Sequence, residues 1–143
     1  MAIPEGFRLL HRSRMAIRWG DMDAMGHVNN TVYFRYLEQA RIETFEVFGF
    51  PPSPDGIGPV IINAHCTFLR QLRYPGEIEV CIWAGALGRS SFEMLHQIRR
   101  TDAPEVLYAE GGAKVVWTDF KAQKSVPIPD FIRQMIQPPA GRA

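Results

Sequence analysis

Two carboxylates, Asp21 and Asp23, precede a run of residues that favours the start of a helix, Asn29 to Thr31. The first N–H groups of a helix are unpaired and carry a positive partial charge, so they can stabilise a developing oxyanion. Gly26 allows the connecting loop to turn back toward those N–H groups. An ionised carboxylate beside them could attack an acyl carbon or activate a water molecule, and Asp23 is the candidate for that role.

Other interpretations of this loop remain open. Both aspartates could serve only as turn and cap residues, and His27 could be a hydrogen-bonded structural side chain. The acidic pair also begins the pattern of a calcium-binding loop, but Met25 and Val32 stand where that loop needs oxygen ligands. Farther along, Arg41 falls within the apolar face of the predicted helix, where it could extend its charged end to solvent or pair with Glu38.

A second polar group, Arg89, Ser90 and Ser91, lies at the predicted tip of a hairpin. The planar guanidinium of arginine can donate two hydrogen bonds to a phosphate, and serine hydroxyls can add others. The alternative is a solvated hairpin end without a ligand.

Hydrophobic periodicity predicts the elements that position these groups. Alternation from Leu10 to Trp19 indicates a strand with one basic face. Apolar residues then recur at helical spacing up to Phe48, which predicts a long amphipathic helix with a wide buried face that ends at Gly49. Four more strands and a short helix are expected over residues 59–72, 76–87, 90–100, 105–119 and 129–136. The strand over 59–72 begins with a continuous apolar run, which predicts a buried strand.

The predicted order of one strand, one long helix and four strands is typical of an α+β fold, with the helix packed on an antiparallel sheet. The 143 residues suit one domain over 1–143, and a net charge of +1 gives no reason to expect nucleic acid as a partner. The two cysteines form no CxxC motif, and each is expected to be a buried thiol. No signal peptide or membrane span is expected, so the predicted location is cytoplasmic.

The stretch from Arg18 to Arg41 resembles the hotdog-fold acyl-CoA thioesterases, specifically the 4-hydroxybenzoyl-CoA thioesterase-like group. The resemblance rests on a basic strand, an acidic pair, a Gly and a Val, and then an aromatic helical segment that ends in an acidic and a basic residue. The strand order fits from about Met15 to Asp119. The resemblance implies a hotdog fold, in which a curved antiparallel five-stranded sheet wraps around one long central helix. It also implies that two subunits join their sheets, giving a homodimer or homotetramer with active sites between subunits.

The resemblance further implies a thioester hydrolase that releases a carboxylic acid and coenzyme A. Its catalytic aspartate corresponds to Asp23, with Asp21 as second choice, and its helix-start amide, which binds the thioester carbonyl, falls at Asn30. Gly26 and His27 would complete the substrate site, and the hairpin cluster Arg89, Ser90 and Ser91 would bind the coenzyme A phosphates. No metal or redox cofactor is implied, because coenzyme A is part of the substrate.

Asn29 and Asn30 stand where some relatives carry an aromatic residue, which favours the broader acyl-CoA group over an aromatic substrate. The loop from Pro51 to Pro59 is a candidate wall or lid for the acyl group. Three other functions on the same fold are an acyl-carrier-protein thioesterase, a dehydratase and a non-catalytic acyl-CoA binding module. A dehydratase needs a histidine and an acid facing each other across the site, whereas His27 is adjacent to Asp23 in the loop.

Overall fold

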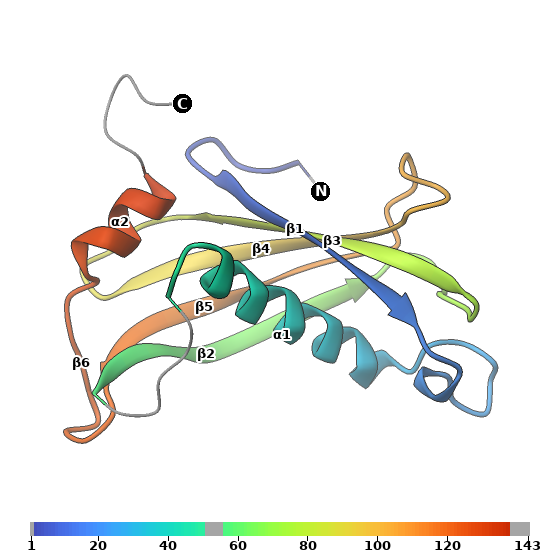
Figure 1. Cartoon of the computed structure of the whole chain (residues 1–143), viewed down its shortest axis with the longest axis horizontal. Coiled ribbons are helices and arrows are strands. Elements are labelled where there is room, and N and C mark those ends of the chain that lie inside the picture. Colours follow the sequence, from blue (N-terminus) through green and yellow to red (C-terminus); the bar gives the residue numbers. More distant parts are fainter. Residues whose placement is uncertain (1, 51–55, 138–143) are drawn as a thin grey trace.

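Five long strands form one antiparallel sheet in the order β1-β3-β4-β5-β2, and helix α1 lies across it (Figure 1). The computed structural model describes residues 2–50 and 56–137. A two-residue strand, β6 (Lys124–Ser125), adds to β5, so the sheet has one short strand more than the five expected. The long strands are β1 (Arg8–Ile17), β2 (Ile57–Phe68), β3 (Gly76–Gly85), β4 (Ser91–Arg100) and β5 (Ala109–Asp119).

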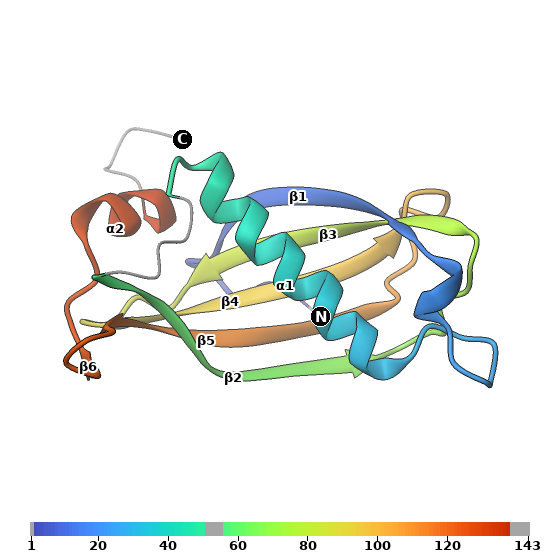
Figure 2. The same ribbon diagram turned by 60° about the horizontal axis from the view of Figure 1, so that its bottom comes forward.

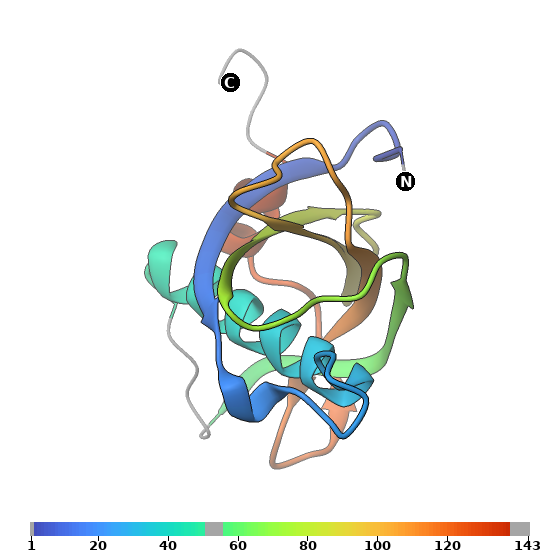
Figure 3. The ribbon, with the colours of Figure 1, turned by 90° about the vertical axis from the view of Figure 1, so that its right-hand side faces the viewer.

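Helix α1 (Asn30–Val47) crosses the concave side of the curved sheet and contacts β1, β3 and β2 (Figures 2 and 3). It begins after Asn29, whose side chain caps the first turn, and it ends before Gly49, whose φ of +85° suits a glycine. The α+β class and antiparallel sheet are confirmed, and the arrangement is consistent with a hotdog fold. The buried residues of α1 are Tyr33, Tyr36, Leu37, Ala40, Thr44 and Phe45.

Alternation along the central strands sets which side chains face α1. One face of β4 is fully buried, and the same holds for one face of β3. These rows meet side by side because the strands pair in register, for example Val80 with Ile98. Packing of these apolar rows against α1 forms the core. The inward rows are Phe92, Met94, His96 and Ile98 on β4, and Ile78, Val80 and Ile82 on β3.

The expectation that β2 is a buried strand is wrong. Among the described strands it lies at the edge of the sheet and pairs with β5 alone, and most of its residues are exposed. Ile62, in the middle of the strand, is 56% exposed. A continuous apolar run shows that both faces are apolar, but it does not show whether the chain itself covers them.

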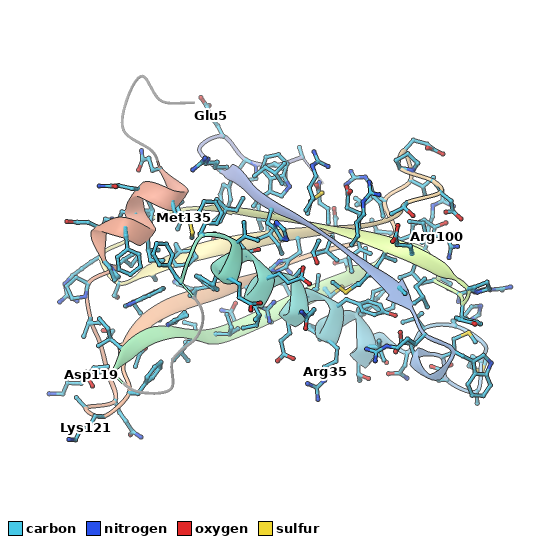
Figure 4. The ribbon with its side chains drawn as sticks, in the orientation of Figure 1. Glu5, Arg35, Arg100, Asp119, Lys121 and Met135 are labelled. Carbon is cyan, nitrogen blue, oxygen red and sulfur yellow. The ribbon has the colours of Figure 1, made fainter. Side chains whose placement is uncertain are left out.

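Two further boundaries differ from expectation. β1 ends at Ile17 rather than Trp19, which is 73% exposed in the short 3-10 helix η1 (Trp19–Asp21). α1 ends at Val47, which is 64% exposed, rather than at Phe48. The predicted tail helix is present as α2 (Asp130–Ile136), which packs its apolar residues at one end of the sheet near the start of β1, with Met135 on that side (Figure 4).

Candidate active site

The loop between β1 and α1 closes on itself through backbone hydrogen bonds. Met22 and Val28 form an isolated antiparallel bridge. Inside it, the N–H of Asp23 donates to the carbonyl of His27 over 3.0 Å, and the N–H of Gly26 donates to the carbonyl of Asp23 over 3.0 Å. Gly26 has a φ of +77°, a conformation that side-chain-bearing residues rarely adopt. The loop therefore returns to the helix start, as the glycine predicted.

The carboxylate of Asp23 is held by two donors. Its Oδ1 accepts from the N–H of Met25 at 2.9 Å, and its Oδ2 accepts from Nδ2 of Asn29 at 3.0 Å. A carboxylate offers about four acceptor positions, so these two bonds leave it able to accept a proton or attack a carbon. The side chain is exposed to solvent. Asp23 is thus oriented and still accessible.

Asn29 connects this carboxylate to the helix. Its Oδ1 accepts from the N–H of Thr31 at 2.9 Å, which caps the first turn of α1. Its own N–H donates to the carbonyl of Asp21 at 3.0 Å. By contrast, the N–H of Asn30 has no hydrogen-bond acceptor within residues 2–50 and 56–137. That N–H belongs to the first helical residue and lies next to the cap that holds Asp23.

An open cleft of about 660 Å³ lies beside the carboxylate. One wall comes from the loop and from α1, and the other comes from the chain that follows β2. Tyr33 holds this second wall, since its hydroxyl accepts from the N–H of Leu72 at 3.3 Å and lies 3.4 Å from the carbonyl of Arg70. The residues that line the cleft are Asp23, Met25, His27, Val28, Asn30, Tyr33, Phe68, Leu69, Arg70 and Gln71.

His27 lines the cleft but faces a cation. Its Nε2 lies 3.0 Å from Nη2 of Arg73. Because a guanidinium N–H can only donate, Nε2 must accept in this contact, and the ring proton is on Nδ1. His27 therefore carries a structural contact to the segment after β2 as well as its place in the cleft.

Asp21, the second choice for the catalytic acid, is placed differently. Its Oδ2 accepts from the hydroxyl of Tyr36 at 2.7 Å and from the N–H of Arg18 at 2.8 Å. It lines a separate hollow, shared with residues of β1 and with the opposite side of α1. Burial and the neighbouring Asp21 carboxylate raise the pKa of the Tyr36 hydroxyl, so this group stays protonated and donates. Through these contacts Asp21 links the loop to helix α1 and has a structural role.

The structure brings Asp23, Gly26, His27 and Asn30 together, but it does not bring Arg89, Ser90 and Ser91 to them. Ser91 begins β4, whereas Arg100 at the other end of β4 contacts the carbonyl of Arg73 beside the cleft. A ten-residue strand spans about 30 Å. Within one chain, the hairpin cluster and the Asp23 loop therefore lie at opposite ends of the sheet (Figure 2).

Part of the proline-rich loop, residues 51–55, lies outside the described residues. Ile57, Gly58 and Pro59 line a different cavity, near the C-terminal half of α1. Sequence reasoning also missed two features of the cleft: the bond from Asn29 to Asp23, and the wall that runs from Phe68 to Gln71. An asparagine six residues after an aspartate, across a glycine turn, is the one signal that could have indicated the first.

The described residues contain no group of three or more metal-ligating side chains, and none of their helices is long and apolar enough to cross a membrane. At the cleft the structure places the Asp23 carboxylate beside the start of α1.

Sequence comparison identifies the family. The model of the thioesterase-like superfamily matches residues 17–136, which include the Asp23 loop, α1 and all of the later strands. The chain belongs to the thioesterase-like superfamily. The expected membership of the hotdog thioesterases, and with it a thioester hydrolase, is confirmed.

Solved structures of similar proteins agree with this family. The PA2801 protein of Pseudomonas aeruginosa, named as a "putative Thioesterase", is 41% identical with a TM-score of 0.85, over 88% of this chain and 97% of its own. A "putative acyl-CoA thioesterase" of Xanthomonas campestris is 37% identical with a TM-score of 0.72, over 77% of this chain and 93% of its own. The BH1999 gentisyl-coenzyme A thioesterase is 26% identical with a TM-score of 0.78, over 87% of this chain and 98% of its own.

Proposed function

We propose that this protein hydrolyses acyl-CoA thioesters, with Asp23 as nucleophile or general base. The observation that carries the proposal is the placement of the Asp23 carboxylate, which is bonded to Asn29 at the start of α1 and opens onto a cleft of about 660 Å³. The names of two similar proteins, an acyl-CoA and a gentisyl-coenzyme A thioesterase, support a coenzyme A thioester as the substrate class.

In the proposed reaction the thioester carbonyl oxygen accepts a hydrogen bond from the N–H of Asn30. The positive partial charge of the helix start then stabilises the oxyanion that forms on that oxygen. Asp23 either attacks the carbonyl carbon or removes a proton from an attacking water molecule. In the first route the carbon–sulfur bond breaks as an anhydride forms between Asp23 and the acyl group, and water then hydrolyses that anhydride to the acid and the free carboxylate. In the second route water adds to the carbonyl carbon, the carbon–sulfur bond breaks, and the water oxygen becomes the second oxygen of the acid. In both routes the thiolate of coenzyme A takes up a proton. These steps need no metal or redox cofactor.

We also propose that two copies pair through the β2 edge. This edge carries backbone N–H and C=O groups that no strand within residues 2–50 and 56–137 pairs, and β2 and α1 together expose apolar side chains beside it. Pairing would cover these side chains and extend the sheet into a second subunit. The exposed apolar residues on this side are Phe34, Ile42, Ile57, Val60, Ile61, Ile62 and Phe68.

The test is thiol release from short-chain, long-chain and aromatic acyl-CoA substrates by the wild type, Asp23→Asn and Asp21→Asn. We expect Asp23→Asn to lose about 10²- to 10⁴-fold in kcat, the range for a general base. Asp21→Asn should retain most of the turnover, since Asp21 points away from the cleft. Equal turnover by wild type and Asp23→Asn would overturn the role of Asp23.

An absence of release from every coenzyme A substrate by folded protein would instead favour a carrier-protein thioester or a non-catalytic binding module. A carrier-protein thioester would then be presented to the same three proteins. A single turnover in ¹⁸O-labelled water separates the two roles of Asp23, because label enters the aspartate only if the carboxylate attacks the substrate.

A further inference from the structure

A second cavity, of about 470 Å³, lies near the C-terminal half of α1. Arg41, which lines it, is eleven positions after Asn30. At 1.5 Å per residue this separates the two by about 16 Å along the helix. The residues that line this cavity are also all different from those that line the cleft at Asp23. Its lining includes residues of α1, the start of β2, the end of β5 and α2.

The walls of this cavity are mainly aromatic. The rings of Phe45 and Trp117 lie 6.4 Å apart, and those of Phe50 and Phe131 lie 4.3 Å apart, centroid to centroid. Aliphatic side chains of Ile42 and of β2 complete the lining. A cavity of this size and character suits the hydrocarbon part of a small ligand, since such sites are mostly apolar with few polar groups.

The charged residues of this lining are Arg41 and Glu38, and Trp117 adds an indole N–H; the cation is the guanidinium of Arg41. Its Nη1 lies 3.3 Å from Nε2 of His96, which must accept because the guanidinium can only donate. Pairing with Glu38 was one of two alternatives for Arg41, but the Glu38 carboxylate binds Arg35 at 3.2 Å. Within the described residues no carboxylate lies within 4.0 Å of Arg41. The predicted ion pair between Arg41 and Glu38 is therefore absent at bonding distance, although Glu38 acts on Arg41 from farther away.

His96 does not neutralise the positive charge of Arg41. It is fully buried on β4, and burial, reinforced by the Arg41 cation, lowers its pKa to about 3. The imidazole is neutral at physiological pH, so Arg41 is a partly buried cation against a neutral acceptor. A cation in such a place has a large desolvation cost, which an anion bonded to it would offset.

We propose that this cavity binds the anion of a small amphipathic carboxylic acid, with the carboxylate on Arg41 and the hydrocarbon part against the aromatic rings. An arginine fork matches a carboxylate with two parallel hydrogen bonds. A free acid of this kind has the chemistry of the product that the proposed reaction releases. The statement that the ligand is a product rests on the proposed function, whereas the binding site does not.

The test is calorimetric titration of the protein with octanoate and with its neutral counterpart octanamide. We expect octanoate to bind the wild type more tightly than octanamide does. Arg41→Gln should weaken octanoate binding by roughly tenfold or more, the value of one charge-assisted bond, and leave octanamide binding unchanged. Lys121→Gln is the control, since Lys121 is an exposed cation that does not line the cavity (Figure 4).

Two further variants keep the proposal testable if Arg41→Gln unfolds. Arg41→Lys retains the cation and should bind octanoate more weakly than the wild type but more tightly than octanamide. Phe131→Ala removes part of the apolar wall from a half-exposed position and should weaken both ligands alike. Equal affinity of the wild type for octanoate and octanamide, or no binding of either, would overturn the proposal.

Failure of this site and failure of the proposed function are distinguishable. The titration is repeated on Asp23→Asn, which should bind octanoate as the wild type does. Octanoate binding by a protein that hydrolyses no thioester would uphold the site and reject the enzyme function. Hydrolysis without octanoate binding would uphold the enzyme function and reject the site. If Arg41→Gln instead separates an oligomer while the wild type ignores octanoate, then Arg41 serves subunit contact and the proposed site is wrong.

Discussion

Asn29 donates from Nδ2 to Oδ2 of Asp23 at 3.0 Å, while its Oδ1 caps the N–H of Thr31. One amide side chain thus fixes both the orientation of the carboxylate and the first turn of α1. The two bonds use opposite ends of the amide, so a substitution can remove one bond and keep the other.

Asn29→Asp removes the bond to Asp23 and keeps the bond to Thr31. The new carboxylate still caps Thr31, but it cannot donate to Asp23 and it adds a like charge beside it. We expect kcat to fall by about tenfold or more, the scale of one lost bond to a charged group, with the free energy of unfolding nearly unchanged. Steady-state kinetics and urea denaturation measure the two quantities. Asn29→Ala, which loses both bonds, should also lose about 1 kcal/mol of stability. Unchanged kcat in Asn29→Asp would show that Asp23 does not need this donor.

Tyr36→Phe tests the structural role of Asp21. The variant removes the hydroxyl that donates to Oδ2 of Asp21 at 2.7 Å and leaves the bond from the Arg18 N–H in place. We expect a loss of about 1–2 kcal/mol in the free energy of unfolding, since the bond involves a charged acceptor. Turnover of the folded protein should stay near that of the wild type. Tyr74→Phe, at an exposed position, is the control in urea denaturation. A stable Tyr36→Phe protein with lost turnover would place Asp21 in the chemistry.

His96 should make stability depend on pH. Its pKa is lowered to about 3 in the folded protein, mainly by burial and also by Arg41 and His65, whereas in the unfolded chain it is near 6.5. As the pH falls below 6.5 the unfolded chain binds a proton that the folded protein does not, so stability decreases down to about pH 3. One such proton contributes a slope of at most about 1.4 kcal/mol per pH unit.

His96→Gln can still accept from Arg41 but does not titrate. We expect its free energy of unfolding to fall less steeply than that of the wild type between pH 6.5 and 4, as measured by urea denaturation at each pH. His27→Gln, which alters a histidine in the loop instead, is the comparison. Parallel curves for the wild type and His96→Gln would contradict the assignment.

Ile62→Glu tests the proposed pairing through β2. Ile62 lies in the middle of the edge strand and is 56% exposed. Two added carboxylates facing each other across a subunit contact would repel, so we expect the dissociation constant of the oligomer to rise by about tenfold or more. Light scattering after size-exclusion chromatography measures the mass over a range of concentrations. Trp19→Glu, at an exposed apolar residue outside the sheet, should leave the mass unchanged. A wild type that runs as a monomer would reject the pairing.

The succession of strands and helices along the chain and the limits of α1 could be predicted from the sequence, because each depends on local periodicity. Alternation predicted the strand over residues 90–100, and Gly49 predicted the end of the helix. The exposure of β2 could not be predicted, since an apolar run is the same whether its own chain or a second molecule covers it.

The site was predictable where its parts are close in sequence. Asp23, Gly26 and the helix start lie within eight residues, and turn and cap chemistry predicts their approach. The separation of Arg89 from this loop depends on which end of β4 the hairpin occupies, and the partnership of Arg41 with His96 depends on packing between α1 and the sheet. Neither relation leaves a local signal in the sequence.

Two parts of the chain form the cleft at Asp23, and one of them can change more freely than the other. The carboxylate, its amide donor and the helix start come from one short stretch in which each bond depends on the next. The opposite wall, Phe68 to Gln71, comes from the chain after an edge strand and joins the first part through Tyr33 and Val28. Under the proposed function, mutations can therefore reshape the wall, and with it the choice of acyl group, without disturbing the bonds that hold Asp23. A fold divided in this way can diversify its substrates during evolution while it keeps one chemistry.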